Sequence, residues 1–174
     1  MSNFLLKSDE VLVRYLNEDD FYTVVKYANN KKIANFLKDN FPNPYKYEHI
    51  EEFYIATTLA SEITNFAIAN EKEFAGMIGF NYLKDIKRFT AEIGYWVAEP
   101  YWGKGYASTA LSLVSNYIFS KKNVSRIQAE VRADNIASIK VLEKVGFTLE
   151  GVLKESFFKN GKMYDSLLYA KMKN

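Results

Sequence analysis

Two glycines separated by one residue, Gly103 and Gly105, lie where a strand-like segment is followed by a helix-like segment. Residues 93–97 are rich in β-branched and aromatic side chains, and apolar side chains recur at helical spacing over residues 107–118. The first amides of a helix are unpaired and carry partial positive charge, so a turn without side chains lets them converge on one anion. The spacing therefore predicts a phosphate site on the main chain of residues 102–108, unless the glycines serve only to turn the chain.

The spacing of these glycines excludes two familiar nucleotide sites. An NTPase phosphate loop has two glycines four residues apart, followed by Lys and then Ser or Thr. Here Lys104 lies between the glycines instead. A dinucleotide fingerprint has a third glycine and an acidic residue about twenty positions later. Neither feature is present in the sequence, so any anion bound here belongs to another class of ligand.

A second group of residues able to do chemistry follows a predicted strand over residues 125–133. Asn135 begins a predicted helix over residues 135–144, Ser138 lies one turn further on, and Gly146 is the stop signal. Asn is a good helix N-cap, and a serine one turn into a helix is often only exposed, so both have a purely structural interpretation. Both side chains are also expected on the same side of the helix start, where a ligand would meet them together.

The two groups together resemble the GNAT superfamily of acetyl-CoA-dependent N-acetyltransferases, most closely its Rim-type branch of ribosomal-protein N-terminal acetyltransferases. The resemblance rests on the glycine turn followed by Asn-x-x-Ser and by Glu-Lys-x-Gly-Phe at residues 143–147, and it extends from about residue 12 to residue 172. It implies acetyl-CoA as cosubstrate and a primary amine as acceptor, either a protein or peptide N-terminus or a small molecule. Relatives of this kind are usually dimers, which allows a homodimer here.

The resemblance also assigns roles to individual residues. The turn would bind the pyrophosphate of coenzyme A, the strand before it would pair with the pantetheine arm, and the Asn135 amide would contact that arm. Gly105 and Ala107 match the family pattern, whereas Trp102 replaces the usual Gln or Arg. The residues expected at the cofactor are Tyr95, Trp96, Val97, Trp102, Gly103, Lys104, Gly105, Tyr106, Ala107, Ser108, Asn135 and Ser138.

Acetyl transfer to an amine requires a held thioester, a neutral amine, stabilised charge on the carbonyl oxygen and a proton for the departing thiolate. By resemblance, the Ser138 hydroxyl lies near the thioester sulfur and would donate to the thiolate. Glu92, in the middle of a predicted strand over residues 90–97, is the candidate base, with Glu130 as a weaker one. The alternatives for Glu92 are a solvent face, a salt bridge, or a water chain that acts in its place.

The composition limits the other functions open to the chain. A net charge of +2, from 23 basic and 21 acidic residues, is too small to indicate nucleic acid as the main ligand. The absence of cysteine excludes disulfides and thiolate metal sites, and no His, Asp and Glu spacing suggests a metal, so we expect metal-free catalysis. No apolar run approaches the ~20 residues that cross a bilayer, and the chain start lacks a secretory signal, so we expect a cytoplasmic protein without membrane contact.

The order of the predicted elements indicates a mixed α/β (α+β) fold. Strands are expected over residues 11–16, 65–70, 74–83, 90–97, 125–133, 148–159 and 163–172, and helices over residues 17–27, 29–37, 46–60, 105–120 and 135–144. A turn at residues 160–161 joins the last two strands as a hairpin. With the resemblance, this pattern implies the GNAT fold: one domain over residues 1–174, with a mixed, mostly antiparallel sheet of about seven strands flanked by helices.

The sequence leaves one alternative function open. A non-catalytic acyl-CoA-binding domain would keep the glycine turn and Asn135 but would have lost acetyl transfer. Replacement of Ser138 by alanine would change no acceptor reaction in such a domain, whereas it would slow an enzyme. The identity of the acceptor amine is open as well, because the early helical region that forms one wall of the acceptor cleft in the family carries no specific motif.

Overall fold

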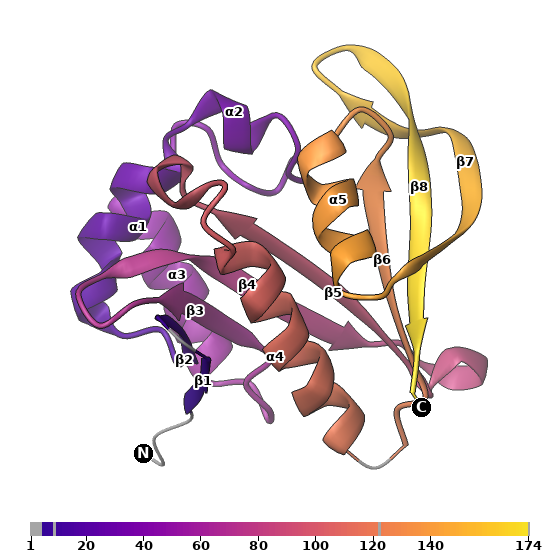
Figure 1. Ribbon diagram of the computed structural model, residues 1–174. Coiled ribbons are helices and arrows are strands. Elements are labelled where there is room, and N and C mark those ends of the chain that lie inside the picture. The colour runs from indigo at the N-terminus through magenta and orange to yellow at the C-terminus, as the bar shows by residue number, and fades with distance from the viewer. Residues whose placement is uncertain (1–4, 9, 122, 174) are drawn as a thin grey trace. The chain divides into compact units, whose positions relative to one another are not determined.

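The computed structural model describes residues 5–8, 10–121 and 123–173, and the strands among them form one mixed sheet (Figure 1). The strands are β1 (Leu5–Ser8), β2 (Val11–Arg14), β3 (Asn65–Ala69), β4 (Phe74–Tyr82), β5 (Thr90–Val97), β6 (Arg126–Arg132), β7 (Thr148–Lys159) and β8 (Lys162–Met172). Their order across the sheet is β1-β2-β3-β4-β5-β6-β8-β7. The β5–β6 pair is parallel, whereas the β1–β2, β2–β3, β3–β4, β6–β8 and β7–β8 pairs are antiparallel.

Along the sequence, the helices lie between these strands. The α-helices are α1 (Phe21–Ala28), α2 (Lys31–Ala34), α3 (Tyr47–Thr58), α4 (Tyr106–Ser120) and α5 (Ile136–Lys144), and the short 3-10 helices are η1 (Glu18–Asp20), η2 (Asp85–Lys87) and η3 (Glu99–Tyr101). The expected mixed sheet flanked by helices is confirmed. It has eight strands where about seven were expected, and the additional strand is β1, which was not predicted. None of the helices in the described ranges has the length and apolar character that would let it cross a membrane.

The chain forms two compact units. The first contains Met1–Gly79 and Tyr95–Leu113, and the second contains Phe80–Gly94 and Val114–Asn174. The chain therefore passes between the units within β4, β5 and α4. The assignment of the whole chain to a single domain stays a prediction.

The core of the first unit lies where α1 and α3 pack on the sheet. In α1, Phe21, Val24 and Ala28 recur at helical spacing and are buried, and Ile50 of α3 is completely buried. Burial of each large apolar side chain contributes about 1.5–3 kcal/mol. The other buried members of this cluster are Leu16, Tyr45, Ala67 and Phe74. The core thus joins both helices to β3 and β4.

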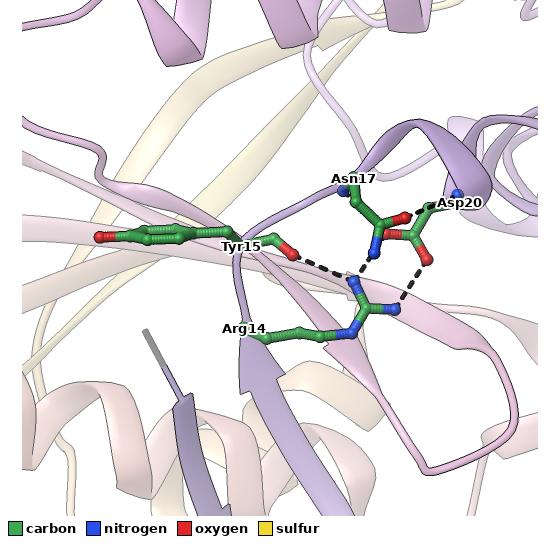
Figure 2. A network of polar contacts seen from close by, with 4 residues as sticks. All are labelled: Arg14, Tyr15, Asn17 and Asp20. Carbon is green, nitrogen blue, oxygen red and sulfur yellow. Dashed lines mark hydrogen bonds and ion pairs between the residues drawn. The ribbon is translucent and has the colours of Figure 1, made fainter. Parts of the chain in front are cut away.

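The entry to α1 is fixed by polar contacts (Figure 2). Asn17 caps η1, since its Oδ1 accepts a hydrogen bond from the Asp20 amide at 3.2 Å. Both guanidinium Nη atoms of Arg14 donate to the Asp20 carboxylate at 2.7 Å, and Nη1 also donates to the Tyr15 carbonyl at 3.0 Å. Because Asp20 is 5% exposed, loss of either partner of this pair would leave a charge without its counterion. The predicted capping chemistry before the first helix is confirmed.

In the second unit, α5 packs against β8. Tyr169 donates to the Glu143 carboxylate at 3.0 Å, and the Lys171 ammonium donates to the Val145 carbonyl at 2.8 Å. The β7–β8 hairpin turns at Asn160 and Gly161, whose φ angles of +50° and +78° are the left-handed pair expected for a tight hairpin. The predicted hairpin at residues 160–161 is therefore confirmed.

Candidate cofactor and catalytic site

The glycine turn of the first unit presents bare main chain. Beyond η3 the chain turns over residues 102–105, and α4 begins at Tyr106. Gly103 has φ +71° and Gly105 has φ +84°, a left-handed conformation in which a side chain is strained. Apart from the adjacent residues in the chain, a Cβ added to either glycine would meet no atom of the described residues within 4 Å. The turn therefore exposes peptide groups at the start of a 15-residue helix, the arrangement that suits an anion.

The Trp102 side chain ties this turn to the strand before it. Its indole Nε1 donates to the carbonyl oxygen of Val97 at 2.6 Å, while 43% of the residue is exposed. Lys104 is also exposed, and its ammonium lies 5.9 Å from the centre of the Tyr101 ring. The Ser108 hydroxyl donates to the Gly105 carbonyl at 3.0 Å within the first turn of α4.

Two tyrosines on either side of the turn connect it to the loop between β3 and β4. Tyr101 donates to the Glu73 carboxylate, and Asn70 Nδ2 donates to the Tyr106 hydroxyl at 3.1 Å. The rings of Tyr101 and Tyr106 lie 4.8 Å apart, centre to centre. Burial and the neighbouring Glu73 carboxylate raise the pKa of the Tyr101 phenol. The glycine turn is thus held from both ends by the contacts of Tyr101 and Tyr106.

β5, which leads into the turn, pairs with β6 over a short stretch only. The parallel register contains three positions, from Thr90 opposite Arg126 to Glu92 opposite Gln128, and β5 continues to Val97. Gly94 faces open space, since a Cβ there would meet nothing within 4 Å. A glycine inside a strand with an open face is typical of a place where another chain or a ligand lies along the backbone.

The catalytic candidates lie in the second unit. Asn135 caps α5, because its Oδ1 accepts a hydrogen bond from the Ser138 amide at 3.2 Å. Both residues are half-buried. Glu92 is half-buried as well, and its Oε2 accepts a hydrogen bond from Gln128 Nε2 at 3.1 Å. The structure therefore brings Asn135 and Ser138 together at one helix start, and places Glu92 against β6.

The weaker base candidate, Glu130, is engaged elsewhere. Its carboxylate accepts a hydrogen bond from Ser166 on β8, and the Ser166 hydroxyl lies 2.6 Å from that of Ser156. Sequence reasoning missed Arg132, the buried last residue of β6, whose guanidinium pairs with Asp134 directly before Asn135. The signal available in the sequence was an arginine near the end of a predicted strand with an aspartate two positions later.

A hollow of about 300 Å³ lies elsewhere in the first unit, beside the Arg14–Asp20 pair. Its walls are β2, the start of α1 and the loop between β3 and β4, with Leu12, Asn17 and Lys72 among the lining residues. Figure 2 shows the polar contacts at its Arg14 wall. None of the described residues predicted to bind cofactor lines it, so this hollow is not the predicted cofactor site.

The described residues contain no group of three or more His, Asp or Glu side chains placed to hold a metal ion. The expectation of metal-free catalysis stays a prediction, because a metal held by substrate would leave no such group.

The sheet order, the parallel β5–β6 pair and the glycine turn at the start of a long helix are the features that the sequence resemblance led us to expect of an acyl-CoA-dependent transferase. Residues 10–148 match the family described as acetyltransferase (GNAT) domain. The chain belongs to this family, and it is an acetyl-CoA-dependent N-acetyltransferase. The resemblance to the GNAT superfamily and its Rim-type branch is confirmed.

Three similar proteins illustrate this membership. An uncharacterized N-acetyltransferase of Bacillus subtilis, YoaA, is 32% identical over 97% of each chain. A spermidine N(1)-acetyltransferase of Vibrio cholerae is 27% identical over 91% of this chain and 90% of its own. The solved structure of the ribosomal L7/L12 alpha-N-protein acetyltransferase RimL in complex with coenzyme A is 25% identical, with a TM-score of 0.86 over 97% of this chain and 98% of that one. The last two of these relatives are named for different acceptors, spermidine and ribosomal protein L7/L12.

Proposed function

We propose that this enzyme transfers the acetyl group of acetyl-CoA directly to a primary amine in a ternary complex, with the diphosphate of coenzyme A bound by the main chain of residues 102–108. The observation that carries this proposal is the open turn at Gly103 and Gly105, where a Cβ on either glycine would have no atom of a described residue within 4 Å, the adjacent residues in the chain aside. The first amides of a helix such as α4 have no partner within the helix, and they would supply hydrogen bonds and partial positive charge to a diphosphate. Lys104, exposed at the same turn, adds a full positive charge.

The pantetheine arm is proposed to lie along the backbone of Tyr95, Trp96 and Val97. The open face at Gly94 supports this, together with the end of the β5–β6 register at Glu92. On the other side of β5, β4 approaches so closely that a Cβ at Gly76 would lie 2.3 Å from the Trp96 carbonyl oxygen. The absence of a side chain at Gly76 is therefore what allows the β4 backbone to lie this close to β5.

In the reaction, the amine nitrogen bonds to the thioester carbonyl carbon while the carbon–sulfur bond breaks. Glu92 takes the proton that the amine loses, directly or through water, and the Ser138 hydroxyl donates a hydrogen bond to the departing thiolate. The Asn135 side chain contacts the pantetheine in addition to capping α5. An α-amine with pKa near 8 loses its proton more readily than a lysine-type amine with pKa near 10, so an N-terminal α-amine suits a carboxylate base well.

The acceptor amine is proposed to bind beside an aromatic group in the first unit. The half-buried Trp96 ring lies 6.0 Å from the Phe41 ring and 5.7 Å from the Phe74 ring, centre to centre. Its contacts with Phe41 join β5 to the loop before α3, the region that forms the acceptor wall in the resembling family. Either a peptide N-terminus or a small amine with an apolar stem would suit such a surface.

We also propose a homodimer formed through β7. This 12-residue strand lies at the end of the sheet order, and most of its residues are exposed. Exposed apolar side chains on a free sheet edge favour pairing with another chain. On β7 these are Leu149, Val152, Leu153 and Phe158. Light scattering of the purified protein tests this, with twice the monomer mass of 20.1 kDa expected and a monomer as the contradicting result.

The enzymatic proposal is tested by release of free thiol. Purified protein is mixed with acetyl-CoA and a panel of peptides with free N-termini, polyamines and other primary amines, and the acetylated product is identified by mass spectrometry. Thiol release that depends on one class of amine is the expected result. Binding of acetyl-CoA without turnover across the panel would indicate the non-catalytic acyl-CoA-binding domain instead.

A further inference from the structure

The guanidinium of Arg132 is buried at the end of β6 and paired with a carboxylate two residues later. Arg132 is 7% exposed, and its Nε donates to one oxygen of Asp134 at 2.6 Å while Nη2 donates to the other at 3.1 Å. A guanidinium removed from water is costly unless charge-assisted hydrogen bonds replace its hydration. The two-pronged pair therefore fixes the Asp134 side chain relative to the end of β6.

Aromatic rings from two neighbouring strands hold the same guanidinium. Its central carbon lies 4.2 Å from the ring centre of Tyr164 on β8 and 5.9 Å from that of Phe157 on β7. A planar cation over an aromatic face is attracted by the ring, and arginine combines such stacking with a two-pronged carboxylate contact better than lysine does. Arg132 is thus fixed from the β7–β8 hairpin and in turn fixes Asp134.

The turn that contains this pair leads directly into α5. The Asn135 amide donates to the Arg132 carbonyl at 2.9 Å, and the Ala133 amide donates to the Asp165 carbonyl of β8 at 2.9 Å. The Asn135 side-chain oxygen then accepts a hydrogen bond from the Ser138 amide. A continuous set of contacts within the second unit therefore runs from Arg132 to the two residues at the start of α5.

We infer that Arg132 is a positioning residue for the acetyl-CoA site: through Asp134 it sets the turn over residues 132–135 and hence the placement of the Asn135 amide and the Ser138 hydroxyl. The inference rests on the proposed roles of Asn135 and Ser138 toward acetyl-CoA. Arg132 itself touches neither the cofactor nor the amine in this scheme. Its effect on the reaction comes entirely through the geometry of the helix start.

A matched control lies on the same strand. Arg126, the first residue of β6, makes a comparable two-pronged pair with Glu150, at 2.6 and 2.5 Å, at the other end of the strand from Arg132. The substitutions Arg132→Lys and Arg126→Lys therefore alter the same kind of contact in the same strand. Only the first is expected to disturb the start of α5. Asp134→Asn alters the same ion pair from its other partner. Because the Asp134 side chain is half-exposed, this substitution is expected to leave the protein folded.

Hydrogen exchange of the cofactor-free protein tests positioning without any catalytic readout. The amide to follow is that of Ser138, which donates to Asn135. We expect this amide to exchange about tenfold faster or more in Arg132→Lys and in Asp134→Asn, since each tenfold corresponds to about 1.4 kcal/mol of local opening. Exchange in Arg126→Lys is expected to match the wild type at this amide. Wild-type exchange at Ser138 in both Arg132→Lys and Asp134→Asn would overturn the inference.

Steady-state kinetics and calorimetric binding of coenzyme A then test the link to the site. Asp134→Asn is expected to raise the KM for acetyl-CoA about tenfold, and the effects of Asp134→Asn and Asn135→Ala are expected to be strongly non-additive, because one acts through the other. Additive effects would overturn the inference. If Asn135→Ala raises the KM for acetyl-CoA but Asp134→Asn has the wild-type KM, only the inference about Arg132 is contradicted. If Asn135→Ala itself has the wild-type KM, the proposed cofactor role of Asn135 is contradicted as well.

Discussion

The indole N–H of Trp102 donates a hydrogen bond to the carbonyl oxygen of Val97, with 2.6 Å between the two heavy atoms. Val97 ends β5 and Trp102 begins the glycine turn, so this bond closes the intervening η3 segment into a loop. At a position where the family pattern has Gln or Arg, the chain thus carries a side chain that anchors the turn to its own strand. The anchor sets the direction in which the bare peptide groups of the turn face.

Trp102→Phe tests this anchor. The ring is retained but the donor is lost, so the turn loses a hydrogen bond with a net value of about 0.5–1.5 kcal/mol. We expect the KM for acetyl-CoA to rise about threefold to tenfold with little change in kcat, since the bond supports binding equally in the ground and transition states. Steady-state kinetics measure both, and Tyr22→Phe, an exposed aromatic of α1, is the control. A KM equal to that of the control would show that the anchor is not needed.

Gly105→Ala tests the bare main chain of the turn. Gly161 of the β7–β8 hairpin is a matched control, because both glycines have positive φ and both would place a new Cβ in open space. The backbone strain of about 1–2 kcal/mol is therefore shared. We expect similar losses of thermal stability in Gly105→Ala and Gly161→Ala. Only Gly105→Ala is expected to raise the acetyl-CoA KM tenfold or more, which corresponds to about 1.4 kcal/mol or more. Equal KM values in the two variants would rule out a diphosphate over Gly105.

Ser138→Ala tests the proposed donor to the thiolate. Loss of a group that assists proton transfer costs on the order of 10²-fold, and a hydrogen-bond donor alone costs somewhat less. We expect kcat to fall about tenfold to a hundredfold, with the KM for acetyl-CoA close to that of the wild type. Ser120→Ala is the control, since that serine is exposed at the end of α4 and donates to the Tyr117 carbonyl. If kcat is unchanged, the thiolate takes its proton from another group.

The buried phenol of Tyr45 leads us to expect that the folded protein loses stability at alkaline pH. Burial raises the pKa of its phenol from 10.0 to about 12, so between these values the unfolded chain has lost a proton that the folded chain keeps. The stabilisation is complete below pH 10 and is lost as the pH rises to 12, with a slope of at most about 1.4 kcal/mol per pH unit. Denaturant unfolding from pH 9 to pH 11 measures the slope, which Tyr45→Phe should reduce. Equal slopes in the two proteins would contradict this assignment.

The elements with strong local signals were predictable from the sequence. β5 has the predicted bounds of residues 90–97, and α5 begins after Asn135 because the cap and the helix start are close in sequence. The hairpin turn at Asn160 and Gly161 followed from two residues that tolerate positive φ. In each case the residues that determine the structure are neighbours in the chain.

Features that depend on distant partners were not predictable in this way. β1 is four residues long and exists through its pairing with β2, while α2 covers only Lys31–Ala34 of the helix expected over residues 29–37. The role of Arg132 depends on Tyr164, which is remote in sequence and reaches it only when β6 and β8 pair. The roles of Asn135 and Ser138 came from resemblance and that of Glu92 from its place in the predicted strand, and all three stay predictions.

The most direct test of the central claim follows the backbone amides of residues 103–108 by NMR during a titration with coenzyme A. If the diphosphate binds on the bare turn, these amides should show the largest shift changes in the protein, and pantetheine, which lacks the diphosphate, should leave them nearly unchanged. Saturable binding of coenzyme A with no shift changes at residues 103–108 would contradict the account.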